Sequence, residues 1–382
     1  MKMETIVNST FAVPHRTFHE DSASISKFRL QKNCKFVVEK NSFGFKQKEL
    51  SYIYQDLYEI GEWITPSPQL SGLYQELAIP RIENLRRVIK SLKRKNLQIL
   101  EIGGGNSLIA EQIAQEFEDV TIICLDPAHE TRFVNNNVHL ISGFFPEQSP
   151  KHKFDLIYSF NTLEHVPDLN LFLNKARDFL HETGLLMLSI PECSKQIANG
   201  DWNLFSQQHV NYFVSPFFFD FIENFGFRIL DYQVQFDESI TTFVADSKLS
   251  NRKALFRDFI LGSSQCEIDS RFISTFNKVA HILDTNKKNL NNFYVHGATA
   301  GIMNIISNLE DANHYWNNLQ IVDNDPIKQG KYLSGFQKKI ISIHEIQDQP
   351  ATVLVASGTF VHEITKSWLS KYPNPNINFY SI

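Results

Sequence analysis

The fold is decided by residues 97–107, LQILEIGGGNS, in which a short apolar run leads directly into an acidic residue and three glycines. Such a run predicts a buried strand, and residues 108–117, after the glycines, predict a helix. Glycine lets the backbone of the turn approach a ligand with no Cβ in the way. A second apolar run, 120–125, ends in Asp126. Strand, glycine turn, helix, strand and carboxylate, in this order, predict an α/β sheet that binds an adenosine.

The predicted ligand is S-adenosylmethionine rather than a dinucleotide. A dinucleotide turn has the spacing G-x-G-x-x-G, but Leu108 stands at the third glycine position. Glu101 precedes the first glycine by two residues, and its carboxylate suits a cationic sulfonium better than a pyrophosphate. We expect Gly103 and Gly105 to pass beneath the methionine part and Asp126 to accept bonds from the ribose. A glycine turn that binds no ligand is the alternative.

The chain from about residue 82 to 232 alternates helical segments with short apolar strands. The expected strands are 98–101, 121–125, 138–142, 156–158 and 185–189. Strands of this kind are buried on both faces and form a parallel, doubly wound sheet. Its ligands bind beyond the carboxyl ends of the strands.

The pattern predicts a Rossmann-like sheet followed by a second, smaller α/β domain. Strand, small-residue turn, helix and strand recur from residue 293 onward. The expected regions are 1–80 (an N-terminal region with a substrate lid), 81–245 (the donor-binding domain), 246–290 (a helical connector) and 291–382 (the second α/β domain).

Composition narrows the partners of this chain of 382 residues. A net charge of −5 disfavours a nucleic-acid partner, because such proteins usually carry a basic excess. Apolar runs stay short of the 18 residues that a membrane span needs, and the four cysteines form no C-x-x-C pair, so neither a membrane anchor nor a metal site is expected. We expect a cytoplasmic monomer or homodimer that acts on a small molecule.

A polar loop, SFNTLEHVPD at residues 159–168, follows the fourth strand and is expected to face the methyl group of the donor. Asn161 is expected to bond either the amino group of the donor or the acceptor. Glu164 is a catalytic candidate and His165 a substrate-lining candidate, although both residues suit helix capping equally well. Phe144, after the third strand, is expected to stack on the adenine unless it belongs to the core, and Pro127 is expected to bind the donor.

His209, in the segment FSQQHVNYF at residues 205–213, is the expected base. An imidazole with a pKa near neutrality can take a proton from a hydroxyl or from an acidic carbon. The alternative is a histidine that only bonds backbone. Tyr58 is a further catalytic candidate, and Asn211 and Tyr212 are expected to contact the substrate.

Several motifs carry a family resemblance. The pattern E-x-G-x-G-x-S resembles the first motif of class I methyltransferases, and N-x-L-E-H-V-P-D resembles a stretch of small-molecule methyltransferases. Residues 294–301, YVHGATAG, and 322–332, VDNDPIKQGKY, resemble two C-terminal motifs of the sugar C-methyltransferases. The resemblance implies methyl transfer from S-adenosylmethionine to a deoxysugar carried on a nucleotide. It also implies that the C-terminal domain either holds the nucleotide or only supports the lid.

Three departures from that family keep the mechanism open. The four-cysteine zinc module of the family is missing, since only Cys34 lies in the first hundred residues. Ser206 and Gln208 replace a tyrosine and a glutamate of the family motif beside His209, and Ala300 replaces a lysine. Carbon and oxygen methylation of a sugar both remain open. So do O-methylation of another small molecule or glycan and a non-catalytic module that binds the donor or a nucleotide.

Overall fold

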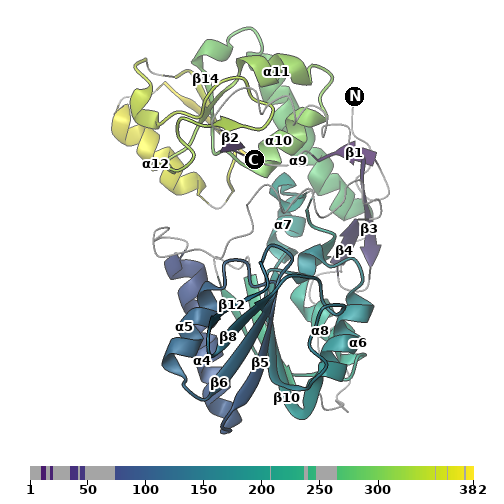
Figure 1. Cartoon of the computed structure of the whole chain (residues 1–382). Helices are drawn as coiled ribbons and strands as arrows, with labels where there is room; N and C mark the ends of the chain where they lie inside the picture. Colours follow the sequence, from purple (N-terminus) through teal and green to yellow (C-terminus); the bar gives the residue numbers. More distant parts are fainter. Residues whose placement is uncertain are drawn as a thin grey trace.

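The computed structural model describes residues 10–13, 18–19, 35–41, 44–47, 74–206, 208–235, 240–246, 265–348, 350–358, 360–373 and 376–382. Figure 1 shows two α/β units, one above the other, with the C-terminal unit at the top. In the parts of the chain listed above, no helix combines the length and the hydropathy needed to cross a membrane.

The lower unit is built on a sheet of eight strands. In spatial order they are β12 (Arg228–Gln235), β13 (Ile240–Asp246), β10 (Leu180–Pro191), β9 (Phe154–Phe160), β5 (Leu97–Ile102), β6 (Val120–Leu125), β8 (Val138–Ile141) and β7 (Arg132–Asn135). The strands from β10 to β8 run parallel, while β13 and β7 are antiparallel to their neighbours. The chain leaves β5 toward β6 and β8 and returns to β9 on the other side, so the sheet has a switch point between β5 and β9.

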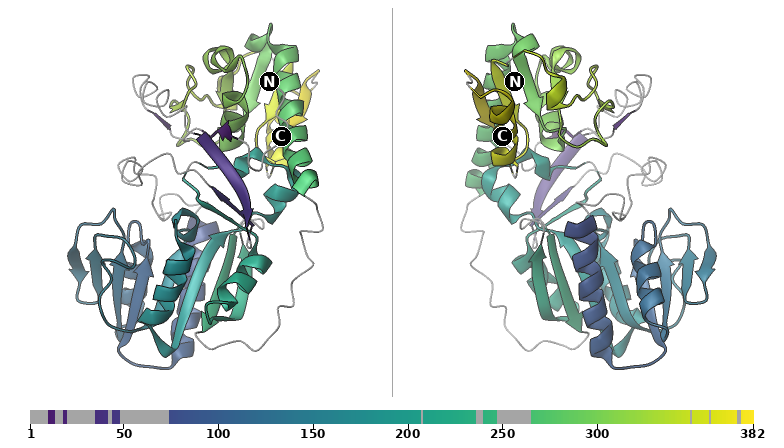
Figure 2. Two further views of the ribbon diagram at one scale, coloured as in Figure 1. Left: turned by 90° about the vertical axis from the view of Figure 1, so that its right-hand side faces the viewer. Right: turned by 90° about the vertical axis from the view of Figure 1, so that its left-hand side faces the viewer.

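Helices cover both faces of this sheet, as Figures 1 and 2 show. One face carries α4 (Ile79–Leu92), which follows the π-helical turn η1 (Tyr74–Ala78), and α5 (Leu108–Glu116). The other carries α6 (Leu169–Phe179) and α8 (Ser215–Glu223). The Asp168 carboxylate caps α6 by accepting from the N–H of Leu171 at 2.9 Å. The predicted Rossmann-like α/β fold is therefore confirmed.

The predicted strands are all present, but β7, β12 and β13 were not predicted. β12 lies at the edge of the sheet and reads RILDYQVQ, with polar residues that hide its apolar alternation. β13 is buried along its whole length although it contains Thr241 and Thr242.

The upper unit has a parallel sheet of four strands. They are β15 (Gln320–Val322), β14 (Phe293–His296), β17 (Thr352–Val355) and β18 (Asn378–Ser381), in that spatial order. Its helices are α9 (Gln265–Asn286), α10 (Ala300–Ser307), α11 (Ala312–Asn318) and α12 (Val361–Lys371), with short turns η4 (Leu290–Asn292) and η5 (Ile343–Glu345). α9 was expected to be a polar connector. It instead buries Phe272, Phe276 and Val279 in the core of this unit.

The segment after β10 joins the two units. It contains α7 (Ser194–Asn199), η3 (Trp202–Leu204) and β11 (Asn211–Phe213). Trp202 and Phe205 are buried in the same core as the residues of α9 and α10. In Figure 1, α7 lies at the top of the lower unit, so the carboxyl end of β10 points toward the upper unit.

The N-terminal strands also touch both units. β1 (Thr10–Ala12), β3 (Lys35–Asn41) and β4 (Gly44–Gln47) form a sheet with β11, and β2 (Phe18–His19) pairs with β16 (Tyr332–Leu333). The predicted lid and Tyr58 lie outside the described residues.

Candidate active site

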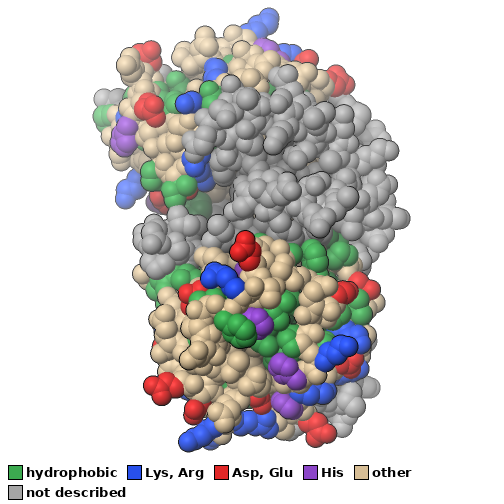
Figure 3. All heavy atoms as spheres, in the orientation of Figure 1, with side chains coloured by type: hydrophobic (Ala, Val, Ile, Leu, Met, Phe, Trp, Pro, Cys, Tyr) green, Lys and Arg blue, Asp and Glu red, His purple; other side chains and the backbone are tan. Residues whose placement is uncertain are grey.

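A cavity of about 190 Å³ opens at the carboxyl ends of β5, β6 and β9. Its lining includes Leu125, Pro127, Phe144, Thr162 and His165. This is the switch point of the sheet, where open α/β sheets bind ligands. Figure 3 shows hydrophobic side chains gathered on the front of the lower unit. The predicted residues Pro127, Phe144 and His165 therefore lie around one cavity.

The glycine turn after β5 has the tight geometry that its sequence implies. Gly103 has a φ of +75°, and a Cβ there would collide with the side chain of Thr162. The N–H of Gly105 donates to Asp126 Oδ2 at 3.0 Å, and the N–H of Ala128 donates to Oδ1 at 2.8 Å. Each carboxylate oxygen accepts more than one bond. Asp126 can thus shape the turn and still accept from a ligand hydroxyl.

Glu101 lies beneath the turn, outside the lining of the cavity. Its carboxyl is buried, and Oε2 accepts a bond from the Cys124 thiol at 3.0 Å. A Cβ on Gly104 would lie 2.8 Å from the same oxygen. Burial raises the pKa of Glu101 to about 7. We expected the Glu101 carboxylate to act directly on a sulfonium. From its position beneath the turn, it acts on the site through the glycine turn.

Asn161 sits in a left-handed conformation, with a φ of +51°, at the end of β9. Its Oδ1 accepts a bond from the guanidinium of Arg81, a residue of α4 that the sequence analysis did not select. Arg81 is almost completely buried, and within the described part of the chain its Nε has no hydrogen-bond partner. Burial lowers the pKa of Arg81 to about 10, so it stays cationic at neutral pH. One signal was available: Arg81 shares a helix face with apolar Leu85 and Val88.

Glu164, His165 and His209 come together beside the cavity. Each offers one ligand atom, and the three atoms lie within 4.8 Å of one another. The two imidazole rings are 5.0 Å apart. The spacing can accommodate a metal ion, a possibility that the sequence analysis did not anticipate.

The electrostatics of this cluster favour neutral groups. Burial, followed by the neighbouring His209, holds the pKa of His165 well below its usual range. Nδ1 of His165 lies 2.9 Å from the carbonyl of Gln208, which only accepts, so Nδ1 carries the proton and Nε2 keeps a lone pair. Burial raises the pKa of Glu164 to about 7, and Oε2 has no hydrogen-bond partner among the residues that the structure describes. The cluster therefore contains a carboxyl oxygen that can accept a proton or bind a cation.

Two predicted substrate residues do not reach the cavity. Asn211 is buried, and its amide donates to the carbonyls of Leu163 and Val166 at 2.9 and 2.7 Å. Tyr212 is fully buried, and its hydroxyl donates to the carbonyl of Ser206 at 3.0 Å. Both side chains hold the loops that carry Glu164 and His209, and their contact with substrate stays a prediction.

The two aromatic residues after β8 have different surroundings. Phe144 is 43% exposed and lines the cavity. Phe145 stacks at an angle on Phe172, with ring centroids 5.0 Å apart, and belongs to the core.

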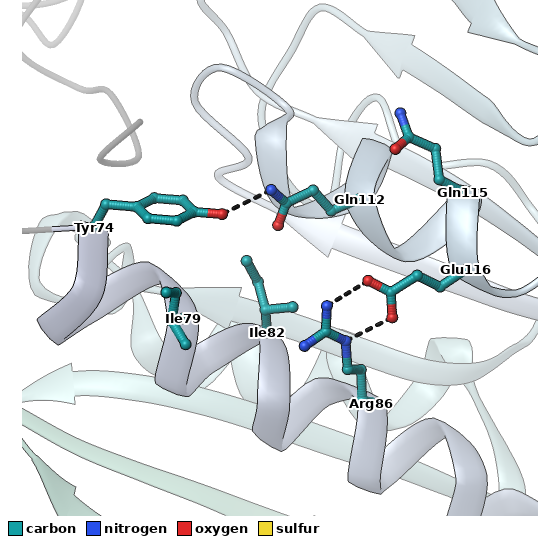
Figure 4. A pocket seen from close by; sticks show the side chains of 7 residues that line it. All are labelled: Tyr74, Ile79, Ile82, Arg86, Gln112, Gln115 and Glu116. Carbon is teal, nitrogen blue, oxygen red and sulfur yellow. Dashed lines mark hydrogen bonds and ion pairs between the residues drawn. The ribbon is translucent and has the colours of Figure 1, made fainter. Parts of the chain in front are cut away.

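A second hollow, of about 330 Å³, lies between α4 and α5 (Figure 4). Gln112 donates to the Tyr74 hydroxyl at 2.7 Å across it, and Arg86 pairs with Glu116 at its other end. None of its lining residues follows the carboxyl end of a strand. The predicted site residues are all absent from it.

Comparisons with known proteins match the lower unit. Residues 74–232 match the family model of a methyltransferase domain. A ubiquinone biosynthesis O-methyltransferase of Bartonella tribocorum is 28% identical over 145 residues, which cover 34% of this chain and 58% of the relative. Its namesake in Bradyrhizobium diazoefficiens is 23% identical over 161 residues, which cover 38% of this chain and 60% of the relative. The chain thus spans less than two thirds of each relative.

Among solved structures, an S-adenosylmethionine-dependent methyltransferase from Clostridium acetobutylicum aligns with 47% of this chain and 98% of its own. The sequence identity is 11% and the TM-score is 0.36. The glycine turn, the strand-end carboxylate and the family match all fall in the same segment. Residues 74–232 therefore match a methyltransferase domain, and S-adenosylmethionine is the methyl donor that this match indicates.

Proposed function

We propose that this protein transfers the methyl group of S-adenosylmethionine to a small-molecule acceptor, with His209 as the base. The observation that carries the proposal is the pair of imidazoles, His165 and His209, beside a cavity at the switch point of the sheet. His165 is neutral, for the reason given above, and the half-buried His209 faces it. When the methyl acceptor loses a proton in this position, the imidazole of His209 is close enough to take it.

We infer one orientation for the donor in the cavity. Its adenine lies against Phe144, and its ribose hydroxyls bond Asp126. Its methionine part then lies over Gly103, and the buried guanidinium of Arg81, whose Nε has no partner among the described residues, is the candidate to bind the carboxylate. The sulfonium methyl group thereby points toward Glu164 and His209.

The transfer needs no covalent intermediate. A lone pair of the acceptor attacks the methyl carbon, the carbon–sulfur bond breaks, and S-adenosylhomocysteine leaves. The acceptor proton passes to His209. The sulfonium is a strong electrophile, so alignment of the two reactants supplies most of the catalysis.

The acceptor that we favour is a nucleotide-linked sugar, methylated on carbon or on oxygen. Support comes from the motifs at residues 294–301 and 322–332, which resemble those of sugar C-methyltransferases. A second candidate is O-methylation of another hydroxylated small molecule, which the names of the two relatives favour.

The test is an incubation of the full-length protein with methyl-deuterated S-adenosylmethionine and a nucleotide-sugar extract, analysed by mass spectrometry. We expect a labelled nucleotide sugar whose fragments distinguish carbon from oxygen methylation. His209→Gln is the matched negative control, and a parallel sample with a chelator tests whether the Glu164 cluster needs a metal ion. S-adenosylhomocysteine binding without any labelled product in this extract would contradict the nucleotide-sugar assignment.

A further inference from the structure

The C-terminal sheet repeats the geometry of the donor turn. β14 leads through a turn at Gly297 into α10, and Asp323 follows β15. Asp323 Oδ2 accepts a bond from the N–H of Ala298 at 2.9 Å, just as Asp126 accepts one from Gly105. The chain runs from β14 to β15 on one side and later to β17 on the other. The carboxyl ends of β14 and β17 thus form a second switch point, the usual place for a ligand.

A side chain of the joining segment, Asn203, lies at this second switch point. Asn203 Oδ1 accepts a bond from the N–H of Gly301, in the first turn of α10, at 2.7 Å. Its amide nitrogen lies 3.4 Å from the carbonyl of Ala356, directly after β17. A Cβ on Gly301 would lie 2.8 Å from the Asn203 side chain. Glycine at this helical position therefore leaves the space that Asn203 fills.

One turn further along α10, Asn304 fixes the backbone of the same segment. Asn304 is fully buried, and its amide donates to the carbonyls of Trp202 and Phe205, each at 2.9 Å. The indole N–H of Trp202 donates to the carbonyl of Phe272 in α9 at 2.9 Å. Residues 202–205 are thus bound to the upper unit by side chains and by backbone.

This segment leads directly to His209. The Tyr212 hydroxyl bonds the carbonyl of Ser206, which also accepts the N–H of His209 at 3.1 Å. On the far side, the N–H of Val210 donates to the carbonyl of Glu164 at 2.6 Å. The backbone on the two sides of His209 is therefore held by hydrogen bonds, on one side to the lower unit and on the other through contacts that depend on α10.

We propose that the C-terminal unit uses its switch-point crevice as a socket for residues 202–205, and that Gly301 and Asn304 are positioning residues for His209. The socket itself follows from the contacts above, whereas the role of His209 as base rests on the proposed function. A nucleotide carried by the acceptor then binds outside this crevice.

The experiment compares Gly301→Ala and Asn304→Asp with the full-length parent protein. Alanine is favoured over glycine within a helix, so Gly301→Ala keeps α10 while displacing Asn203. Asn308→Asp is the matched control, because Asn308 is the C-cap of α10 and its amide donates to the carbonyls of Ala12 and Asn304. Hydrogen exchange of residues 206–213, measured by mass spectrometry, reports the anchoring. Calorimetry with S-adenosylhomocysteine reports the donor site.

Both socket variants should exchange residues 206–213 at least tenfold faster, while Asn308→Asp exchanges like the parent. Affinity for S-adenosylhomocysteine should stay within twofold, and in the transfer assay kcat should fall at least tenfold with an unchanged KM for the donor. Unchanged exchange in both variants, or equal acceleration in Asn308→Asp, would overturn the proposal. So would protection of residues 297–304 by added uridine diphosphate. Absence of turnover in the parent would count against the proposed function and leave the exchange result intact.

Discussion

Replacement of Glu101 by glutamine should remove a pH-dependent cost of folding. Burial raises the pKa of this carboxyl from 4.5 to about 7. Between these values the folded protein keeps a proton that the unfolded chain has lost, so the free energy of unfolding falls as the pH rises through this window. At about 1.4 kcal/mol per pH unit, the loss amounts to about 3 kcal/mol by pH 7. Glutamine is nearly isosteric with the protonated acid and has no charge to bury.

We therefore expect Glu101→Gln to match the parent at pH 4.5 and to exceed its stability by up to about 3 kcal/mol at pH 8. Urea unfolding, followed by fluorescence across this range, measures the difference. Glu118→Gln, at an exposed carboxylate of the same unit, is the control and should show no such trend. A Glu101→Gln variant whose difference from the parent is the same at every pH would refute the reasoning about burial.

Three further predictions concern the donor and the base. Asp126→Ala should weaken S-adenosylhomocysteine binding by about 1–3 kcal/mol. Asp323→Ala, which removes the equivalent contact in the upper unit, should leave this binding unchanged. Calorimetry that finds equal losses in the two variants would refute the ribose assignment. His209→Gln should lower turnover by about 10²–10⁴-fold with unaltered donor affinity, and a fully active variant would mean that another group takes the proton. Gly103→Ala should cost about 1–3 kcal/mol of stability through its positive φ and also weaken donor binding through Thr162, as thermal denaturation and calorimetry can check.

The conformation of the donor turn was predictable because residues close together in the sequence determine it. The strand at 97–102, the left-handed Gly103 and the strand-end Asp126 follow from apolar runs, glycine and a single carboxylate. Arg81 was not found, because its importance depends on burial and on a contact with Asn161, 80 residues away.

The backbone contacts of Asn211 and Tyr212 were not predicted, for a related reason. Polar side chains in a candidate loop look equally suited to substrate and to backbone carbonyls in the sequence. Only the tertiary structure shows that these two are turned inward to Leu163, Val166 and Ser206. The polar composition of α9 likewise concealed its buried aromatic residues, because one apolar face suffices for a core helix.

The binding of residues 202–205 by the C-terminal unit has a consequence for the order of folding during synthesis on the ribosome. Residues 74–232 leave the ribosome before residues 300–307 exist, and large proteins fold unit by unit as they emerge. During that interval Trp202 and Phe205 lack the core that later covers them, and the carbonyls that Asn304 will bind face water. The nascent methyltransferase domain is thus assembled around its donor turn first, and its base-bearing loop is set in place last.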